Sequence, residues 1–371
     1  MRQFIAYRFV SRAMSHLRRR GNGATYWAQS GDATIMPFLG YVQYQLILLA
    51  SRSEKSRTNR MSEYPTELSL IQKKHVCLLY HFASLEYLKG LQVRLHELMQ
   101  FVDPTLAKVK LQGRDVLLTN SRWGTRDTSE NWVQNGRAFL ANFELSIARQ
   151  IAERAFEVYS FTDAYNCGRG LSEYSLNWMT PEEEDEFQSR FDDLYLYAQN
   201  IDRTLKKFNV AGGWDDFDLT MCLTEHPEAL GDATALRLRS DITAHSGTTP
   251  PRTGVYLPLD DPHGTPQFCW TGKPSGKLKE CATFNDLGLE ALASVGRQAL
   301  WLDDYRMYQF VQSHRRDPRL IADSFFKDAV NDPKRTASLV ARHAFTSRPC
   351  DWIYVEQLHG QPIDFSEDSS S

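Results

Sequence analysis

The chain has 371 residues, of which 42% are hydrophobic, 12% aromatic and 24% charged. These values allow one large or two smaller globular domains and exclude disorder for most of the chain. The net charge of −3 conceals an asymmetry, because residues 1–60 carry +8 and leave −11 for the remainder. An acidic body argues against nucleic acid as the direct ligand and is compatible with a basic protein partner.

Residues 1–60 are expected to form a basic extension or linker, and Met61 offers a second start that would make it dispensable. The run Thr34–Ala50 is the most apolar in the chain. It has 17 residues and contains Pro37, whereas a membrane-spanning helix needs about 20 apolar residues. We therefore do not expect membrane insertion, and a membrane anchor formed by this run beside Arg18–Arg20 stays an alternative.

Residues 61–212 are predicted to form a bundle of long helices. Apolar residues at steps of three and four from Leu78 to Val102 predict the first helix, with a stop at Asp103-Pro104. Residues 109–118 alternate weakly and suggest a small hairpin about Gly113. A second helix is expected to begin near Ser129 and to fade by Cys167.

The third helix has the clearest signals. Thr180, Pro181 and Glu183 stand at the N-cap, first and third positions of a capping box. Apolar residues then alternate at steps of four and three, which predicts close antiparallel packing as far as the glycines that follow Ala211. Their positions are Phe187, Phe191, Leu194, Ala198, Ile201, Leu205 and Phe208.

Residues 213–364 are predicted to be a helical region with a β-hairpin insert at 250–272. Short helices are expected over 214–242, a long helix over 285–313, shorter ones near 318–330 and 333–346, and a disordered tail over 365–371. Val255–Leu257 and Gln267–Trp270 are β-prone runs separated by a segment rich in Pro, Asp and Gly. The expected fold class is therefore mainly α, a bundle of long antiparallel helices with a small β-hairpin insertion, arranged as one domain or two lobes.

The sequence contains no familiar motif for nucleophilic catalysis, phosphate binding or zinc binding. It has no G-x-S-x-G elbow and no phosphate-binding loop, and Asp260-Asp261 are sequence neighbours that would face different ways. His245, His263, Cys269 and Cys281 lack the close pairing of zinc ligands, so neither a metal nor a cofactor is expected. The six cysteines contain no CxxC pair, which favours free thiols in a reducing, cytoplasmic compartment.

Exposed acids and aromatics are the residues expected to bind a partner. Trp214 could be a hot-spot anchor or a core residue, and the acidic run could be a docking patch or favourable charge at a helix N-terminus. The candidates are Asp260, Asp261, His263, Trp214, Asp215, Asp216, Glu182, Glu183, Glu184 and Asp185.

One segment resembles a known family. Pro251-Arg252-Thr253-Gly254-Val255-Tyr256, Gln267-Phe268-Cys269-Trp270 and Thr283-Phe284-Asn285 are similar to bacterial immunity proteins of polymorphic toxin systems, the immunity protein 71 and immunity protein 72 families. The resemblance covers roughly residues 210–310. It implies a mainly helical protein without catalytic residues that neutralises a toxin delivered by type VI or contact-dependent secretion.

Two classes of function follow. The leading hypothesis is an immunity protein that binds a basic-surfaced toxin and occludes its active site. The alternative is an enzyme of unknown type with a site between the helical body and the hairpin, using His245, His263 or Asp261. The sequence does not identify the toxin or the oligomeric state.

Overall fold

The computed structural model describes residues 67–120, 124–206, 208–363 and 365. The expected N-terminal extension, its apolar run and nearly all of the expected tail lie outside these residues. The described residues belong to one unit, Tyr64–Ser371.

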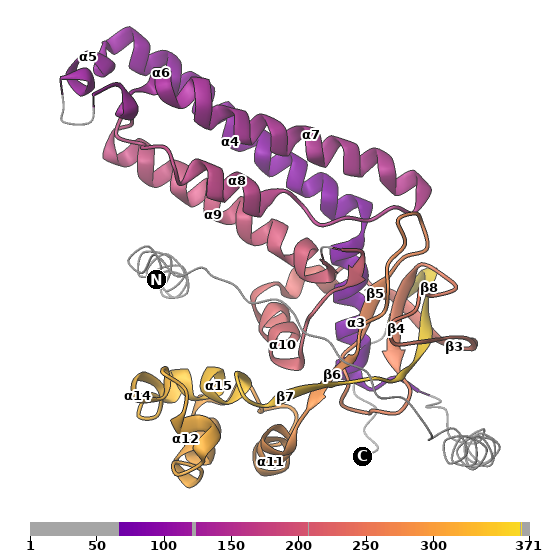
Figure 1. Ribbon diagram of the computed structural model, residues 1–371. Coiled ribbons are helices and arrows are strands. Elements are labelled where there is room, and N and C mark those ends of the chain that lie inside the picture. The colour runs from indigo at the N-terminus through magenta and orange to yellow at the C-terminus, as the bar shows by residue number, and fades with distance from the viewer. Residues whose placement is uncertain (1–66, 121–123, 207, 364, 366–371) are drawn as a thin grey trace, which may run out of the picture. The chain divides into compact units, whose positions relative to one another are not determined.

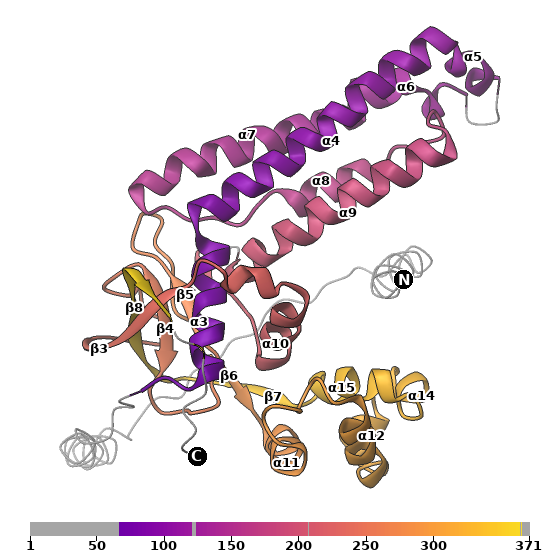
Figure 2. The ribbon, with the colours of Figure 1, turned by 180° about the vertical axis from the view of Figure 1, so that it is seen from behind.

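Long helices form the first half of this unit (Figures 1 and 2). The helix α4 packs against both α7 and α9, as its stripe of buried residues at steps of three and four requires. The short helix α8 packs on α7 and α9, and α3 joins α4 to the sheets. Their bounds are α3 Leu70–Ala83, α4 Leu85–Gln112, α7 Arg137–Glu153, α8 Ala164–Leu171 and α9 Pro181–Thr204.

The predicted stop at Asp103-Pro104 is wrong, because α4 runs through Pro104 and ends at Gly113, where φ is +63°. Val109 extends the buried stripe one heptad beyond Val102, so packing outweighs the proline. The hairpin predicted over 109–118 is also wrong. These residues complete α4 and begin the short helix α5, Arg114–Thr119.

The second and third helices begin as predicted. Ser129 opens the short helix α6, Ser129–Asn131, which leads through a π-helical turn into α7, although the capping hydroxyl belongs to Thr128. Thr180 and Glu183 form the reciprocal capping box of α9. The predicted seam of α9 is buried from Phe187 to Leu205. Phe208 departs from it and is 91% exposed, because the chain turns there between β1, Leu205–Lys206, and β2, Val210–Ala211.

The expected mainly α fold with a small hairpin is wrong, since eight strands among the described residues form three antiparallel sheets. The expected hairpin exists and pairs Val255 with Phe268, but it supplies only two strands of a four-stranded sheet ordered β3-β8-β4-β5. The strands of that sheet are β3 Thr234–His245, β4 Gly254–Pro258, β5 Gln267–Cys269 and β8 Asp351–Pro362, and a further pair is formed by β6 Cys281–Phe284 and β7 Phe345–Arg348.

The four-stranded sheet buries side chains on both faces. Val255, Leu257 and Val355 belong to the core shared with the helices, and α3 packs against β4 and β5. Tyr256 and Tyr354 alternate with them and belong to a smaller core on the opposite face. The four-stranded sheet therefore lies between the core that it shares with the long helices and the smaller core on its other face.

The remaining helices are short. Those from α11 onward surround a core of their own, whereas α10 packs on α3 and buries Leu219 and Cys222 in the core of the long helices. The helix predicted over 285–313 is interrupted at Gly296, where φ is +85°, and Leu300 and Trp301 are buried in the connection. None of the helices among the described residues is long and apolar enough to cross a membrane. The bounds are α10 Asp216–Glu225, α11 Asp286–Val295, α12 Asp304–Ser313, α13 Pro318–Ile321, α14 Phe326–Ala329 and α15 Pro333–Ala341.

Candidate functional site

The acidic hairpin loop between β4 and β5 is fixed from inside the protein. Asp261 is buried, its Oδ2 lies 2.9 Å from Arg348 Nε, and its Oδ1 accepts a hydrogen bond from the backbone N–H of His263. His263 is half-buried and packs on Phe284, and burial lowers its pKa. Asp260 is exposed, while its carbonyl accepts a hydrogen bond from Arg348. Of the two predicted aspartates in this loop, Asp260 exposes its carboxylate to solvent and Asp261 does not.

The second predicted group, at the start of α10, is also mostly internal. Trp214 is buried, stacks on Phe82 with ring centroids 5.7 Å apart and donates its Nε1–H to Thr204 Oγ1. It is therefore a core residue and not an exposed anchor for a partner. Asp216 is buried and accepts a hydrogen bond from Trp301 Nε1 at 2.8 Å. Asp215 caps α10, and burial raises its pKa to about 6.

The acidic run at the start of α9 divides into one structural and several exposed carboxylates. Glu183 completes the capping box and accepts hydrogen bonds from Lys108 and Arg114, and the Arg114 bond contributes most to lowering its pKa to about 2. Its neighbours Glu182, Glu184 and Asp185 are exposed. Favourable charge at the helix N-terminus therefore describes Glu183, and also Glu182, whose pKa is lowered by hydrogen bonds with its own backbone and with Thr180, although its side chain is exposed. Glu184 and Asp185 are exposed and can meet a partner.

Exposed aliphatic side chains occur on α4 and α5, the elements whose basic residues pair with Glu183. Leu111 at the end of α4 is 89% exposed, and Val116 and Leu117 in α5 are 65% and 79% exposed. The Arg114–Glu183 and Lys108–Glu183 ion pairs hold the end of α4 and α5 against the first turn of α9. We call this surface the helical tip, formed by Leu111, Val116, Leu117, Glu182, Glu184 and Asp185.

The helical tip is held in place by further contacts. Asp115 of α5 accepts hydrogen bonds from the backbone N–H and the hydroxyl of Ser129, at 2.8 and 2.7 Å. Both α5 and the start of α9 lie at the same end of the long helices (Figures 1 and 2). The exposed aliphatic groups therefore sit on an anchored frame. Sequence periodicity missed them because residues 109–118 were predicted to form a hairpin.

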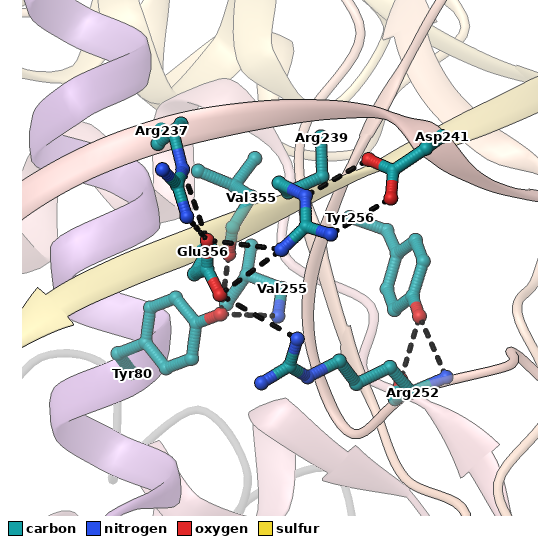
Figure 3. Close-up of polar contacts among 9 residues, drawn as sticks. All are labelled: Tyr80, Arg237, Arg239, Asp241, Arg252, Val255, Tyr256, Val355 and Glu356. Carbon is teal, nitrogen blue, oxygen red and sulfur yellow. Dashed lines mark hydrogen bonds and ion pairs between the residues drawn. The ribbon is translucent and has the colours of Figure 1, made fainter.

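A basic group on the four-stranded sheet was also missed (Figure 3). Arg237 and Arg239 of β3 and Arg252, which precedes β4, converge on Glu356 of β8, with Arg239 also bonded to Asp241. Hydrogen bonds from Arg237 and Arg239 lower the pKa of Glu356. Strand pairing creates this group, because Arg237 faces Glu356 across the β3–β8 ladder.

The most unusual thiol of the described residues lies beside the same sheet. Cys350 is buried with Cys281 as its neighbour, and hydrogen bonds from Cys281 and Ser246 lower the pKa of Cys350. Burial raises the pKa of Cys77, Cys167, Cys222 and Cys269 to about 12. Cys350 therefore differs from the other thiols in the direction of its pKa shift, and it is only 7% exposed.

Of the residues named for the enzyme hypothesis, Asp261 and His263 lie together in the loop between β4 and β5, and His245 has a different partner. His245 Nδ1 bonds to Asp351, whereas His263 contacts Phe284 and Asp261 bonds to Arg348. No group of three or more His, Cys, Asp or Glu side chains converges as metal ligands within the described part of the chain.

Comparisons with known proteins add no relative. No model of a known protein family matches the chain, and neither a curated protein nor a solved structure is significantly similar to it.

Proposed function

We propose that this chain is an immunity protein that binds a basic-surfaced antibacterial toxin and occludes its active site, and that the helical tip is its docking surface. The observation that carries the proposal is that three exposed aliphatic side chains and the exposed acids occur at the same end of the long helices, on elements joined by the Lys108–Glu183 and Arg114–Glu183 ion pairs. Exposed apolar groups rimmed by charge are characteristic of protein interfaces.

The two kinds of side chain have complementary roles. Leu111, Val116 and Leu117 supply apolar area that a partner can bury, and Glu182, Glu184 and Asp185 supply charge that attracts a basic surface and sets orientation. The fixed frame around Glu183 and Asp115 lowers the ordering cost of binding. A basic nucleic-acid-binding cleft is the kind of toxin surface that such a tip fits.

The resemblance to immunity proteins rests on residues that build the framework of the sheets. The hydroxyl of Tyr256 donates to the carbonyl of Arg252 and accepts from its N–H, which closes the turn before β4. Asn285 caps α11. Because these residues serve the framework, a binding surface for one particular toxin can lie elsewhere, at the helical tip.

The test is to co-express the chain with the polypeptide encoded beside its gene and to measure Kd by calorimetry. Leu117→Ser is compared with Leu145→Ser, since Leu145 of α7 is 68% exposed and lies outside the tip. We expect Leu117→Ser to raise Kd about tenfold or more and Leu145→Ser to leave it unchanged. Equal affinity of both variants would remove the tip as the docking surface, and no complex with the wild-type chain would contradict the immunity proposal.

A further inference from the structure

A cavity of about 260 Å³ lies where β1 and the chain between β2 and α10 meet β6 and β7. It is lined by Lys206, Gly213, Gln267, Lys279, Thr346 and Ser347, among others. Its volume is somewhat below that of sites for drug-sized ligands, about 300–1,000 Å³, so it suits a small ligand.

Two lysines converge in this cavity. A Cβ atom added to Gly213 would lie 3.0 Å from Lys206 Nζ and 3.4 Å from Lys279 Nζ, so the two nitrogens are at most 6.4 Å apart. Within the part of the chain that the structure describes, neither ammonium forms an ion pair, whereas Lys89 and Lys108 each hold a carboxylate at 2.8 Å. Two close like charges repel, and an anion between them would offset that repulsion.

The pKa of Lys279 agrees with two ammonium groups lying close together. Lys279 is half-buried, and its burial, followed by the charge of Lys206, lowers its pKa. Two carboxylates also line the cavity. Asp215 is engaged as the N-cap of α10, and burial raises its pKa to about 6, so its carboxylate is still mostly ionised at pH 7 and the cavity becomes more positive below pH 6. Glu280 is exposed to solvent.

The cavity wall is shaped by backbone and by hydroxyl groups. A Cβ on Gly212 would lie 1.8 Å from the carbonyl oxygen of Arg203, so only glycine permits this close approach. Gln267 is held by hydrogen bonds with the backbone of Lys279 and Glu280. Thr346 and Ser347 of β7 are exposed lining residues, and because neighbours on a strand face opposite sides, only one of their hydroxyls can face the cavity.

We propose that this cavity is a binding site for a small oxyanion, a phosphate or carboxylate group, held between the ammonium groups of Lys206 and Lys279. Such a group is opposite in charge to the two cations and can accept hydrogen bonds from both lysines. The site is independent of the helical tip and does not require the immunity function.

The test titrates the full chain with inorganic phosphate and, separately, with succinate, at ionic strength matched by sodium chloride. Lys279→Met and Lys206→Met remove one cation each, and Lys327→Met is the control because Lys327 is an exposed lysine of α14. We expect saturable binding of at least one anion, with Kd raised tenfold or more in both cavity variants and unchanged in the control. Phosphate binding would assign a phosphorylated ligand, and succinate binding a carboxylate.

Because Lys206 is exposed, its variant is expected to fold even if Lys279→Met does not. Chemical shifts of methylated lysine amines provide a second readout, in which Lys206 and Lys279 should respond together to the anion. The proposal is overturned if neither anion binds saturably, or if Lys206→Met binds the anion as tightly as the wild-type chain does.

Discussion

Asp216 connects α10 to the C-terminal helices by charge. Its Oδ1 lies 3.0 Å from Arg297 Nη1 without hydrogen-bond alignment, and its Oδ2 accepts from Trp301. The contact with Arg297 is therefore mainly a charge–charge interaction. The chain around Asp216 predicted an acidic helix start, but the partners lie more than eighty residues away and could not be predicted from local sequence.

Asp216→Asn removes the charge and leaves the guanidinium of Arg297 unpaired. Breaking a buried ion pair costs about 3–5 kcal/mol, and partial exposure of Arg297 places the expected loss near the lower end, about 3 kcal/mol. Urea denaturation measures the free energy of unfolding. Asp328→Asn is the matched control at an exposed site and is expected to change it by less than about 0.5 kcal/mol. Equal effects of the two substitutions would contradict this role for Asp216.

His75 of α3 makes folding sensitive to pH. It is buried, its Nε2 has no hydrogen-bond partner, and burial is the main cause that lowers its pKa to about 4. Nearby Asp216 opposes this shift, whereas Arg297 and Lys74 add to it. Between pH 6.5 and 4 the unfolded chain binds the proton more readily, so this residue reduces stability as the pH falls.

A shift of this size corresponds to a loss of about 2 kcal/mol between pH 7 and pH 5. The measurement compares urea denaturation of the wild-type chain and His75→Leu at both pH values. We expect the wild-type chain to lose about 2 kcal/mol more than the variant, because other titrating groups, including Asp215 with its opposite sign, are common to both. Parallel pH profiles would show that His75 does not titrate in this way.

At the scale of elements, Tyr80 links α3 to the sheet (Figure 3). Its hydroxyl donates to the carbonyl of Val355 in β8 and accepts from the N–H of Val255 in β4. These two residues are partners in the β4–β8 register. A tyrosine hydroxyl thus completes the hydrogen bonding of two strands at the point where the helix crosses them.

Tyr80→Phe removes the hydroxyl and leaves a backbone N–H and a carbonyl without that partner. The expected cost is about 1–3 kcal/mol, with faster amide hydrogen exchange in β4 and β8 than in α9. Tyr305→Phe serves as the control because Tyr305 is 65% exposed. If exchange in β4 and β8 is unchanged, the strands do not depend on the Tyr80 hydroxyl.

Helix starts could be predicted from the sequence, whereas sheet partners could not. The capping box of Thr180 and Glu183 is a local signal, and α9 begins where that signal predicts. The strand β3 carries an alternation of Leu236 and Leu238 with Arg237 and Arg239 that was missed in favour of short helices. Its partner β8 begins more than a hundred residues later, and a single sequence contains no signal for that pairing.

At the scale of the whole molecule, charge is divided between two surfaces. A helix of the length of α4 extends about 40 Å. Its first turns lie beside α3, which packs on the sheet that bears the arginines around Glu356, and its last turn reaches the acidic helical tip. A basic partner is therefore expected to approach the tip and not the arginine group, whose three cations are offset in part by Glu356 and Asp241.

The sequence could not predict which of the candidate acidic residues are exposed to solvent. Composition and helix-start signals identified acidic groups, but Asp216 and Asp261 are engaged inside the protein, whereas Glu184 and Asp185 remain exposed. The apolar half of the helical tip arises because α4 continues past Pro104 and carries Leu111 into solvent.

The most direct test of the immunity proposal is bacterial growth. The polypeptide encoded beside this chain's gene is expressed alone, with the wild-type chain, or with a chain carrying Leu117→Ser, Glu184→Lys and Asp185→Lys. The account predicts growth arrest with the polypeptide alone, rescue by the wild-type chain, and loss of rescue by the tip variant at equal abundance of folded protein. Growth arrest that the wild-type chain does not relieve would contradict it.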